Sequence, residues 1–79
     1  MVCELKKRKI NGNIITYEYC DSRFPSDVGV IEVDVSKEKN WNFIKKTRNN
    51  SDILGYEASR RISRMFREDG FPDTAYICE

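Results

Sequence analysis

Four arginines crowd one stretch of this 79-residue chain and carry its clearest chemical signal. Arg60, Arg64 and Arg67 are spaced at i, i+4 and i+7, and Arg61 and Tyr56 lie close to them in the sequence. In a helix this spacing places the guanidinium groups on one face, where they can contact phosphates and make binding depend steeply on salt. These five residues are therefore our predicted binding face, weighed against the plainer interpretation of a solvated polar helix surface.

Other residue types offer little for catalysis. The chain has no histidine, which is the usual general base near neutral pH. Glu32 and Asp34 are two residues apart on one predicted strand, as an acid and base pair could be, but alternate residues share a face in every half-exposed sheet. We therefore expect a protein that is not an enzyme, with no catalytic residues and no cofactor.

The three cysteines, Cys3, Cys20 and Cys78, are scattered. They lack the paired spacing of a zinc site, so we expect no metal centre. Their odd number argues against a disulfide framework. We expect all three to be reduced, and a Cys3–Cys20 bond across the first hairpin is the exception left open.

The arginines need a helix to position them, and the pattern predicts one from about Asp52 to Asp69. Apolar residues at i, i+4, i+8, i+11 and i+12 form a stripe on the other side, which needs a partner surface. The stripe consists of Leu54, Ala58, Ile62, Met65 and Phe66.

The ends of this helix are marked by residues with capping chemistry. Ser51 or Asp52 can cap the first turn with a side-chain oxygen. Gly70 is expected to take the left-handed conformation at the C-terminus, which would bring Phe71 back against Phe66.

The segment Val2–Cys20 predicts a β-hairpin around Asn11–Gly12. A two-residue turn would place Leu5 opposite Glu18, mixing apolar and charged residues on both faces. A three-residue loop that adds the preceding isoleucine would instead pair Leu5 with Tyr17 and gather the apolar side chains on one face. We favour the three-residue loop.

Three more segments predict strands: Val28–Val35, Trp41–Arg48 and the terminal Ala75–Cys78. Short connections make them antiparallel, and a single helix must cover their apolar face. The predicted fold is α+β, a four- to five-stranded antiparallel sheet with one helix packed on one face, in the order ββββα plus a short C-terminal strand. A chain of 79 residues fills one core, so we predict one domain over residues 1–79.

The formal net charge of +1 gives no overall attraction for a polyanion, so only local patches such as the run Lys6–Lys9 and the helix arginines could act. No apolar segment approaches 18 residues and none has the pattern of a signal peptide. We therefore expect a cytoplasmic protein without a membrane partner.

The NGNIITYEYC hairpin, the GVIEVDV strand and the helix exit Gly70-Phe71-Pro72 resemble a group of short uncharacterised bacterial proteins. In that group a tyrosine-rich hairpin leads into a Val-Asp strand and then into a helix ending at Gly-Phe-Pro. The resemblance covers most of the chain. It implies the α+β fold and a bacterial cytoplasm, and it implies no activity and no functional residues.

Two classes of function are consistent with these features. The missing catalytic groups, the small core and the surplus of aromatic residues favour a non-catalytic protein-interaction domain that forms a homodimer or binds another protein. An open edge strand, Val28–Val35 or Ala75–Cys78, could provide the contact. The alternative is nucleic-acid or polyanion binding through the arginine face, helped by Lys6–Lys9.

Overall fold

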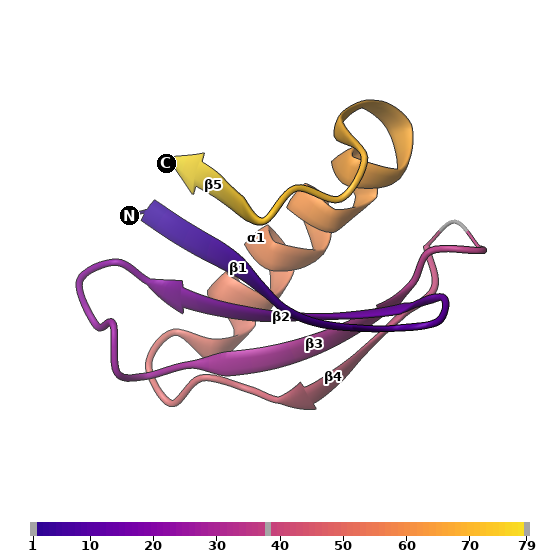
Figure 1. The fold of residues 1–79 in the computed structure, drawn as a ribbon. Helices are drawn as coiled ribbons and strands as arrows, with labels where there is room; N and C mark the ends of the chain where they lie inside the picture. Colours follow the sequence, from indigo (N-terminus) through magenta and orange to yellow (C-terminus); the bar gives the residue numbers. More distant parts are fainter. Residues whose placement is uncertain (1, 38, 79) are drawn as a thin grey trace.

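A computed structural model describes residues 2–37 and 39–78 of the chain, with the backbone alone at residues 69 and 78. These residues form a five-stranded antiparallel sheet in the order β4-β3-β2-β1-β5, covered on one face by a single helix (Figure 1). The predicted α+β fold is confirmed. The strands are β1 (Val2–Asn11), β2 (Ile14–Asp21), β3 (Gly29–Asp34), β4 (Trp41–Lys45) and β5 (Thr74–Cys78). Helix α1 (Ser51–Arg64) continues into a π-helical turn (Met65–Asp69).

The hairpin of β1 and β2 has a register that differs from both predicted loops. Leu5 lies opposite Tyr19 rather than Tyr17, and the chain reverses after Asn11. Gly12 takes a φ of 62°, which suits the first position of a two-residue turn. The observed register keeps the apolar residues on one face, as we expected, but shifts the pairing by two residues.

Charge explains why this shift is favourable. The three-residue loop would have set Glu4 against Glu18, whereas the observed register sets Lys6 opposite Glu18 and allows Arg8 on the same face to form an ion pair with Glu18. Opposite charges facing each other across a strand pair are stabilising, and like charges are not. A β-bulge between Lys7 and Lys9 then adjusts the register before the turn, which the sequence pattern did not reveal.

The same register bears on whether Cys3 and Cys20 form a disulfide bond. Cys3 faces Asp21 and Cys20 faces Glu4, so the two cysteines lie on opposite faces of the sheet. Both are free thiols, and the Cys3–Cys20 bond left open by the sequence is not formed. The side chain of Cys78 lies outside the described part of the chain.

The core lies between α1 and the sheet. The predicted helix stripe is confirmed: Leu54, Ala58 and Ile62 are fully buried, Met65 is 1% exposed, and Phe66 packs against the core from its margin. The sheet contributes the alternate residues of its strands. Those buried on the sheet side are Cys3, Leu5, Ile15, Tyr17, Tyr19, Ile31, Val33 and Ala75.

Both helix ends differ in detail from the prediction. Neither Ser51 nor Asp52 caps the N-terminus, because the capping position is Asn50, which is left-handed (φ 52°, ψ 38°) and makes no side-chain capping bond. At the other end Gly70 has the expected positive φ of 68°, but its ψ of −152° is outside the left-handed helical region. The preceding π-helical turn widens the helix and changes how the chain leaves it.

Phe71 nevertheless packs edge-on against Phe66, with 5.1 Å between ring centroids, as predicted. The segment that follows the helix is then fixed to the hairpin by three bonds. Lys7 Nζ donates to Phe71 O (2.8 Å), Tyr17 Oη donates to Pro72 O (2.7 Å), and the backbone N of Lys7 donates to Asp73 O (2.7 Å). These bonds deliver the chain to the side of β1, where β5 completes the sheet.

The edges of the sheet are β4 and β5. The expectation that Val28–Val35 forms an open edge is therefore wrong, because β3 pairs with β2 on one side and β4 on the other. The terminal strand does lie at an edge, as expected. The described ends of the chain consequently run side by side in β1 and β5 (Figure 1).

Candidate anion-binding hollow beside β5

The predicted binding face opens onto a hollow of about 530 Å³ between α1 and β5. We call this feature the arginine hollow. Four of the five predicted residues come together here. The hollow is lined by Lys39, Arg60, Arg61, Ser63, Arg64, Arg67, Tyr76 and Ile77. Among the described residues its lining holds five cationic side chains and no carboxylate.

Two of the arginines are oriented by carboxylates one turn away on the helix. Arg60 Nη1 lies 3.3 Å from Glu57 Oε2, and the Glu57 side chain is almost fully buried. Arg64 Nε lies 3.0 Å from Glu68 Oε2 in an exposed pair. These pairs reduce the positive charge beside the hollow, but they also hold two guanidinium groups in defined orientations.

Arg61 and Arg67 differ in their environment. Arg61 is half-buried, whereas Arg67 is exposed. Burial raises the pKa of Tyr17 to about 12, with Asp73 acting in the same direction and the positive charge of Arg61 acting against it. Arg61 is therefore close enough to the core to influence a buried hydroxyl, which an arginine pointing straight into solvent would not do.

Tyr56 is the predicted residue that does not line the hollow. Its ring is 62% exposed and lies at a separate groove, together with Trp41 and Phe43 near the N-terminal half of α1. It still touches the arginine face, because the guanidinium carbon of Arg60 lies 5.7 Å from the ring centroid. Its contribution is thus to hold Arg60 through a cation–π contact.

Four residues of the hollow lie outside the predicted binding face: Lys39, Ser63, Tyr76 and Ile77. The apolar spacing at the end of the chain indicated a strand, but it did not show which strand would be its neighbour. Tyr76 and Ile77 reach the arginines because β5 pairs with β1. Lys39 carries no local signal, since it lies in the turn between β3 and β4, where its φ is 59°.

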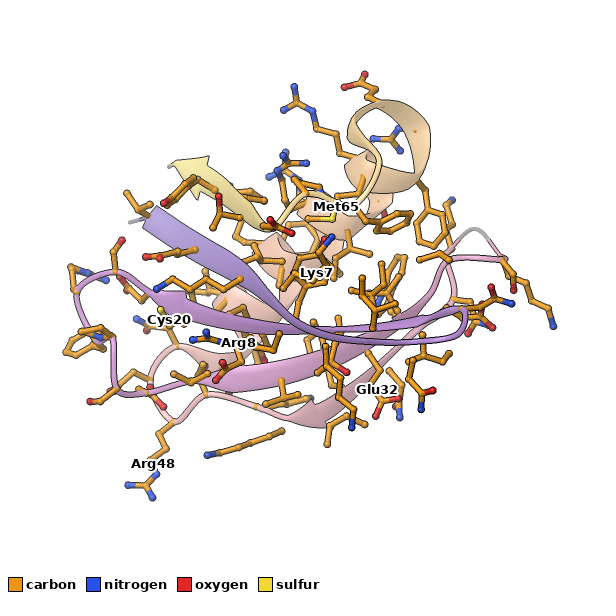
Figure 2. The ribbon with its side chains drawn as sticks, in the orientation of Figure 1. Lys7, Arg8, Cys20, Glu32, Arg48 and Met65 are labelled. Carbon is orange, nitrogen blue, oxygen red and sulfur yellow. The ribbon has the colours of Figure 1, made fainter. Side chains whose placement is uncertain are left out.

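The basic run Lys6–Lys9 does not extend the hollow. Lys6 pairs with Glu4 (3.4 Å), and Arg8 pairs with Glu18 on the face of the sheet away from α1. Lys7 points to the helix side, where it fixes the segment after the helix (Figure 2). The hypothesis that this run helps the helix arginines is thus not supported by where its side chains lie.

The two carboxylates considered for catalysis have ordinary surroundings. Asp34 accepts bonds from the Ser36 hydroxyl (2.6 Å) and the Ser36 backbone N (2.9 Å), and both bonds lower its pKa. Glu32 lies opposite Thr16 and Asn42 on the face away from the helix (Figure 2). Asp34 therefore stabilises the turn after β3.

No group of three or more Cys, Asp or Glu side chains that the structure describes lies close enough together to hold a metal ion. None of the helices formed by residues 2–37 and 39–78 is long and apolar enough to cross a membrane. The cytoplasmic location and the bacterial source remain predictions.

No protein-family model, curated protein or solved structure matches this chain. The resemblance of the hairpin and the helix exit to a group of short bacterial proteins therefore remains an untested expectation.

Proposed function

We propose that this protein is a non-catalytic binding domain that holds an anionic partner in the arginine hollow. The observation that supports this function is the gathering of five cationic side chains, without a carboxylate among the described lining residues, around a hollow of about 530 Å³. A concave surface of one charge concentrates its field and attracts ligands of the opposite charge. Guanidinium groups suit this role because they bind carboxylates and phosphates with two parallel hydrogen bonds.

The charge balance bears on the strength of binding. Arg60 and Arg64 already interact with Glu57 and Glu68, and the whole chain carries a net charge of only +1. An anionic partner must therefore share these guanidinium groups with the helix carboxylates. We expect moderate affinity that falls as salt increases.

The same hollow argues against one form of the homodimer. If two copies paired through β5 across a two-fold axis normal to the sheet, both helices would lie on the same face and both arginine hollows would meet at the junction. Arginines of the two copies would then face each other, and like charges opposed across an interface are unfavourable. A partner of opposite charge fits this edge better than a second copy of the chain does.

A nucleic acid is the second candidate partner. The observation that favours it is Tyr76, which is 55% exposed on the face of β5 away from α1, while its strand borders the hollow. An exposed aromatic ring at the rim of a cationic surface can stack on an unpaired base while the cations contact phosphates. This candidate differs from an acidic polypeptide in the chemistry of the ligand, and it uses the same residues.

The test compares two charge reversals of equal size. Arg67→Glu alters the hollow without breaking an ion pair between described residues, and Lys9→Glu makes the same change of net charge on β1. Fluorescence anisotropy would measure the binding of labelled polyglutamate and labelled oligothymidylate at about 50 and about 200 mM salt. We expect Arg67→Glu to weaken the binding of at least one probe about tenfold and Lys9→Glu to change it less than about twofold.

Two results would contradict the proposal. In the first, neither probe binds at the lower salt concentration. In the second, both substitutions weaken binding equally, which would show that net charge matters and the hollow does not. Circular dichroism of each variant provides the folding control.

A further inference from the structure

The hydrogen-bond register of β5 shows which of its backbone groups face outward. The N–H of Lys7 donates to the carbonyl of Asp73 at the start of the ladder between β1 and β5. Along an antiparallel ladder, residue pairs that exchange backbone hydrogen bonds alternate with pairs that do not. Ala75 and Ile77 therefore bond to β1, and the N–H and C=O groups of Tyr76 point to the outer edge.

This edge lacks the usual protection against strand addition. β5 contains no charged residue and no proline, and its five pairs with β1 show no register shift. Natural sheets commonly protect an exposed edge with a lysine, a proline, a bulge or a covering element. The outward backbone groups of β5 form a template for one more strand.

The arginine hollow lies directly beside this template, because Tyr76 and Ile77 of β5 contribute to its lining. A strand added to β5 would point alternate side chains toward the helix face of the sheet, where the arginines are. Carboxylates at every second position of that strand would complement the cations. The hollow therefore favours one charge and one spacing in the incoming chain.

We propose that the partner is an extended acidic polypeptide segment of another protein, which adds to β5 as a sixth strand and places alternate carboxylates in the arginine hollow. This inference rests on the proposed function and adds the class of partner and its conformation. Backbone bonds to β5 supply affinity that is independent of sequence, and the arginines select the acidic chain. A folded acidic surface or a nucleic acid would use the cations without using the backbone of β5.

Proline at position 76 separates these possibilities. The Tyr76 N–H faces outward, so Tyr76→Pro removes one donor from the template and leaves the bonds of Ala75 and Ile77 with β1 in place. Tyr76→Thr is the matched control, because threonine also lacks the ring but keeps the N–H and favours strands. Comparing the two variants isolates the backbone contribution from that of the aromatic ring.

The probe is a labelled peptide of about ten residues in which glutamate alternates with valine, used with the 79-residue chain. We expect Tyr76→Pro to weaken its binding about tenfold relative to Tyr76→Thr, the loss that corresponds to one hydrogen bond. We also expect the bound peptide to slow hydrogen exchange at the Tyr76 amide in the unsubstituted protein. Methylation of alternate peptide nitrogens, which removes its strand donors while keeping its charge, should weaken binding similarly.

The possible failures are distinguishable. Equal binding by Tyr76→Pro and Tyr76→Thr, without exchange protection at residue 76, would overturn strand addition while leaving anion binding at the hollow intact. Binding of oligothymidylate that depends on Arg67, with no binding of the acidic peptide, would overturn the polypeptide partner and keep the hollow. No binding of any anionic probe would overturn both this inference and the proposed function.

Discussion

The two edges of this sheet are protected in different ways. At the β4 edge the pairing with β3 has a register shift between Val30 and Ile31, and the strand ends at Lys45. A bulge and a lysine are both devices that discourage another strand from pairing. At the β5 edge the ladder with β1 is regular and the strand has no charged residue.

This difference shows that one small sheet can close one edge and leave the other available. The β4 edge disrupts its own hydrogen-bond template. The β5 edge keeps the template and is bordered instead by the cations of the arginine hollow. Repulsion between these cations discourages pairing with a second copy, while an acidic chain is attracted.

The largest effect is expected on the β4 side, where the ring of Tyr19 lies over Gly29 and meets Phe43 edge-on at 5.8 Å. A Cβ at Gly29 would overlap the Tyr19 ring, which is fully packed. Gly29→Ala should therefore lower the free energy of unfolding by about 3 kcal/mol, measured by urea denaturation.

Gly55→Ala is the control for this substitution, because its new Cβ would lie at an ordinary 3.7 Å from Phe43. Removing a glycine from the helix should raise the free energy of unfolding by about 0.5–1 kcal/mol. If Gly29→Ala left the free energy of unfolding unchanged, that result would contradict the close contact between the Tyr19 ring and β3.

On the β5 side, Tyr17 holds the segment that leads into the strand through its bond to Pro72 O. Tyr17→Phe should lower the free energy of unfolding by about 1 kcal/mol near neutral pH, because one hydrogen bond is lost. Urea unfolding of both proteins at the same pH would measure the difference.

The stability of the protein at alkaline pH provides a second test of the role of Tyr17. The pKa of Tyr17 is raised from 10 to about 12 by burial, so its contribution is present below pH 10 and is lost as pH rises toward 12. The pKa of Cys3 is also raised, from 9 to about 12, chiefly by burial. Tyr17→Phe should therefore reduce the alkaline loss of stability, and the loss due to Cys3 should persist. An unchanged slope above pH 10 in Tyr17→Phe would contradict the assignment.

A smaller effect is expected when Lys45, the lysine at the β4 edge, is replaced. Lys45→Val should strengthen self-association by roughly twofold to fivefold, because a charge that discourages strand pairing is removed. Lys37→Val makes the same change in the turn before β4 and should leave association unaltered. Sedimentation velocity over a range of concentrations would compare them. Equal behaviour of the two variants would show that Lys45 does not protect the edge.

The smallest effect is expected at Asp27, which connects the loop before β3 to the segment after β4. Its carboxylate accepts bonds from the backbone N of Arg48 and of Asn49, each at 2.8 Å, and these bonds lower its pKa below 3.8. The stabilisation is thus present above pH 3.8 and is lost as pH falls further. Asp27→Asn should unfold at a slightly lower temperature at pH 7, and the difference from the unsubstituted protein should shrink at pH 3. A constant difference at both pH values would contradict this role.

Local spacing in the sequence was enough to predict the elements and their buried faces. The spacing of Leu54, Ala58 and Ile62 fixed which side of the helix enters the core, and the alternation at Ile31 and Val33 did the same for β3. Such periodicities are local and follow directly from helix and strand geometry. The arginine face was predictable for the same reason, since its four arginines lie within three turns of one helix.

The way in which these elements meet depends on contacts between residues far apart in the sequence. The hairpin register depended on which residues face each other across strands, and Lys6 opposite Glu18 could not be chosen from a turn signal alone. The position of Tyr76 beside the arginines depended on the pairing of β5 with β1. Several strand orders bury the same apolar residues, so local pattern does not select among them. The choice depends on long-range contacts such as those that Lys7 and Tyr17 make with the segment after the helix.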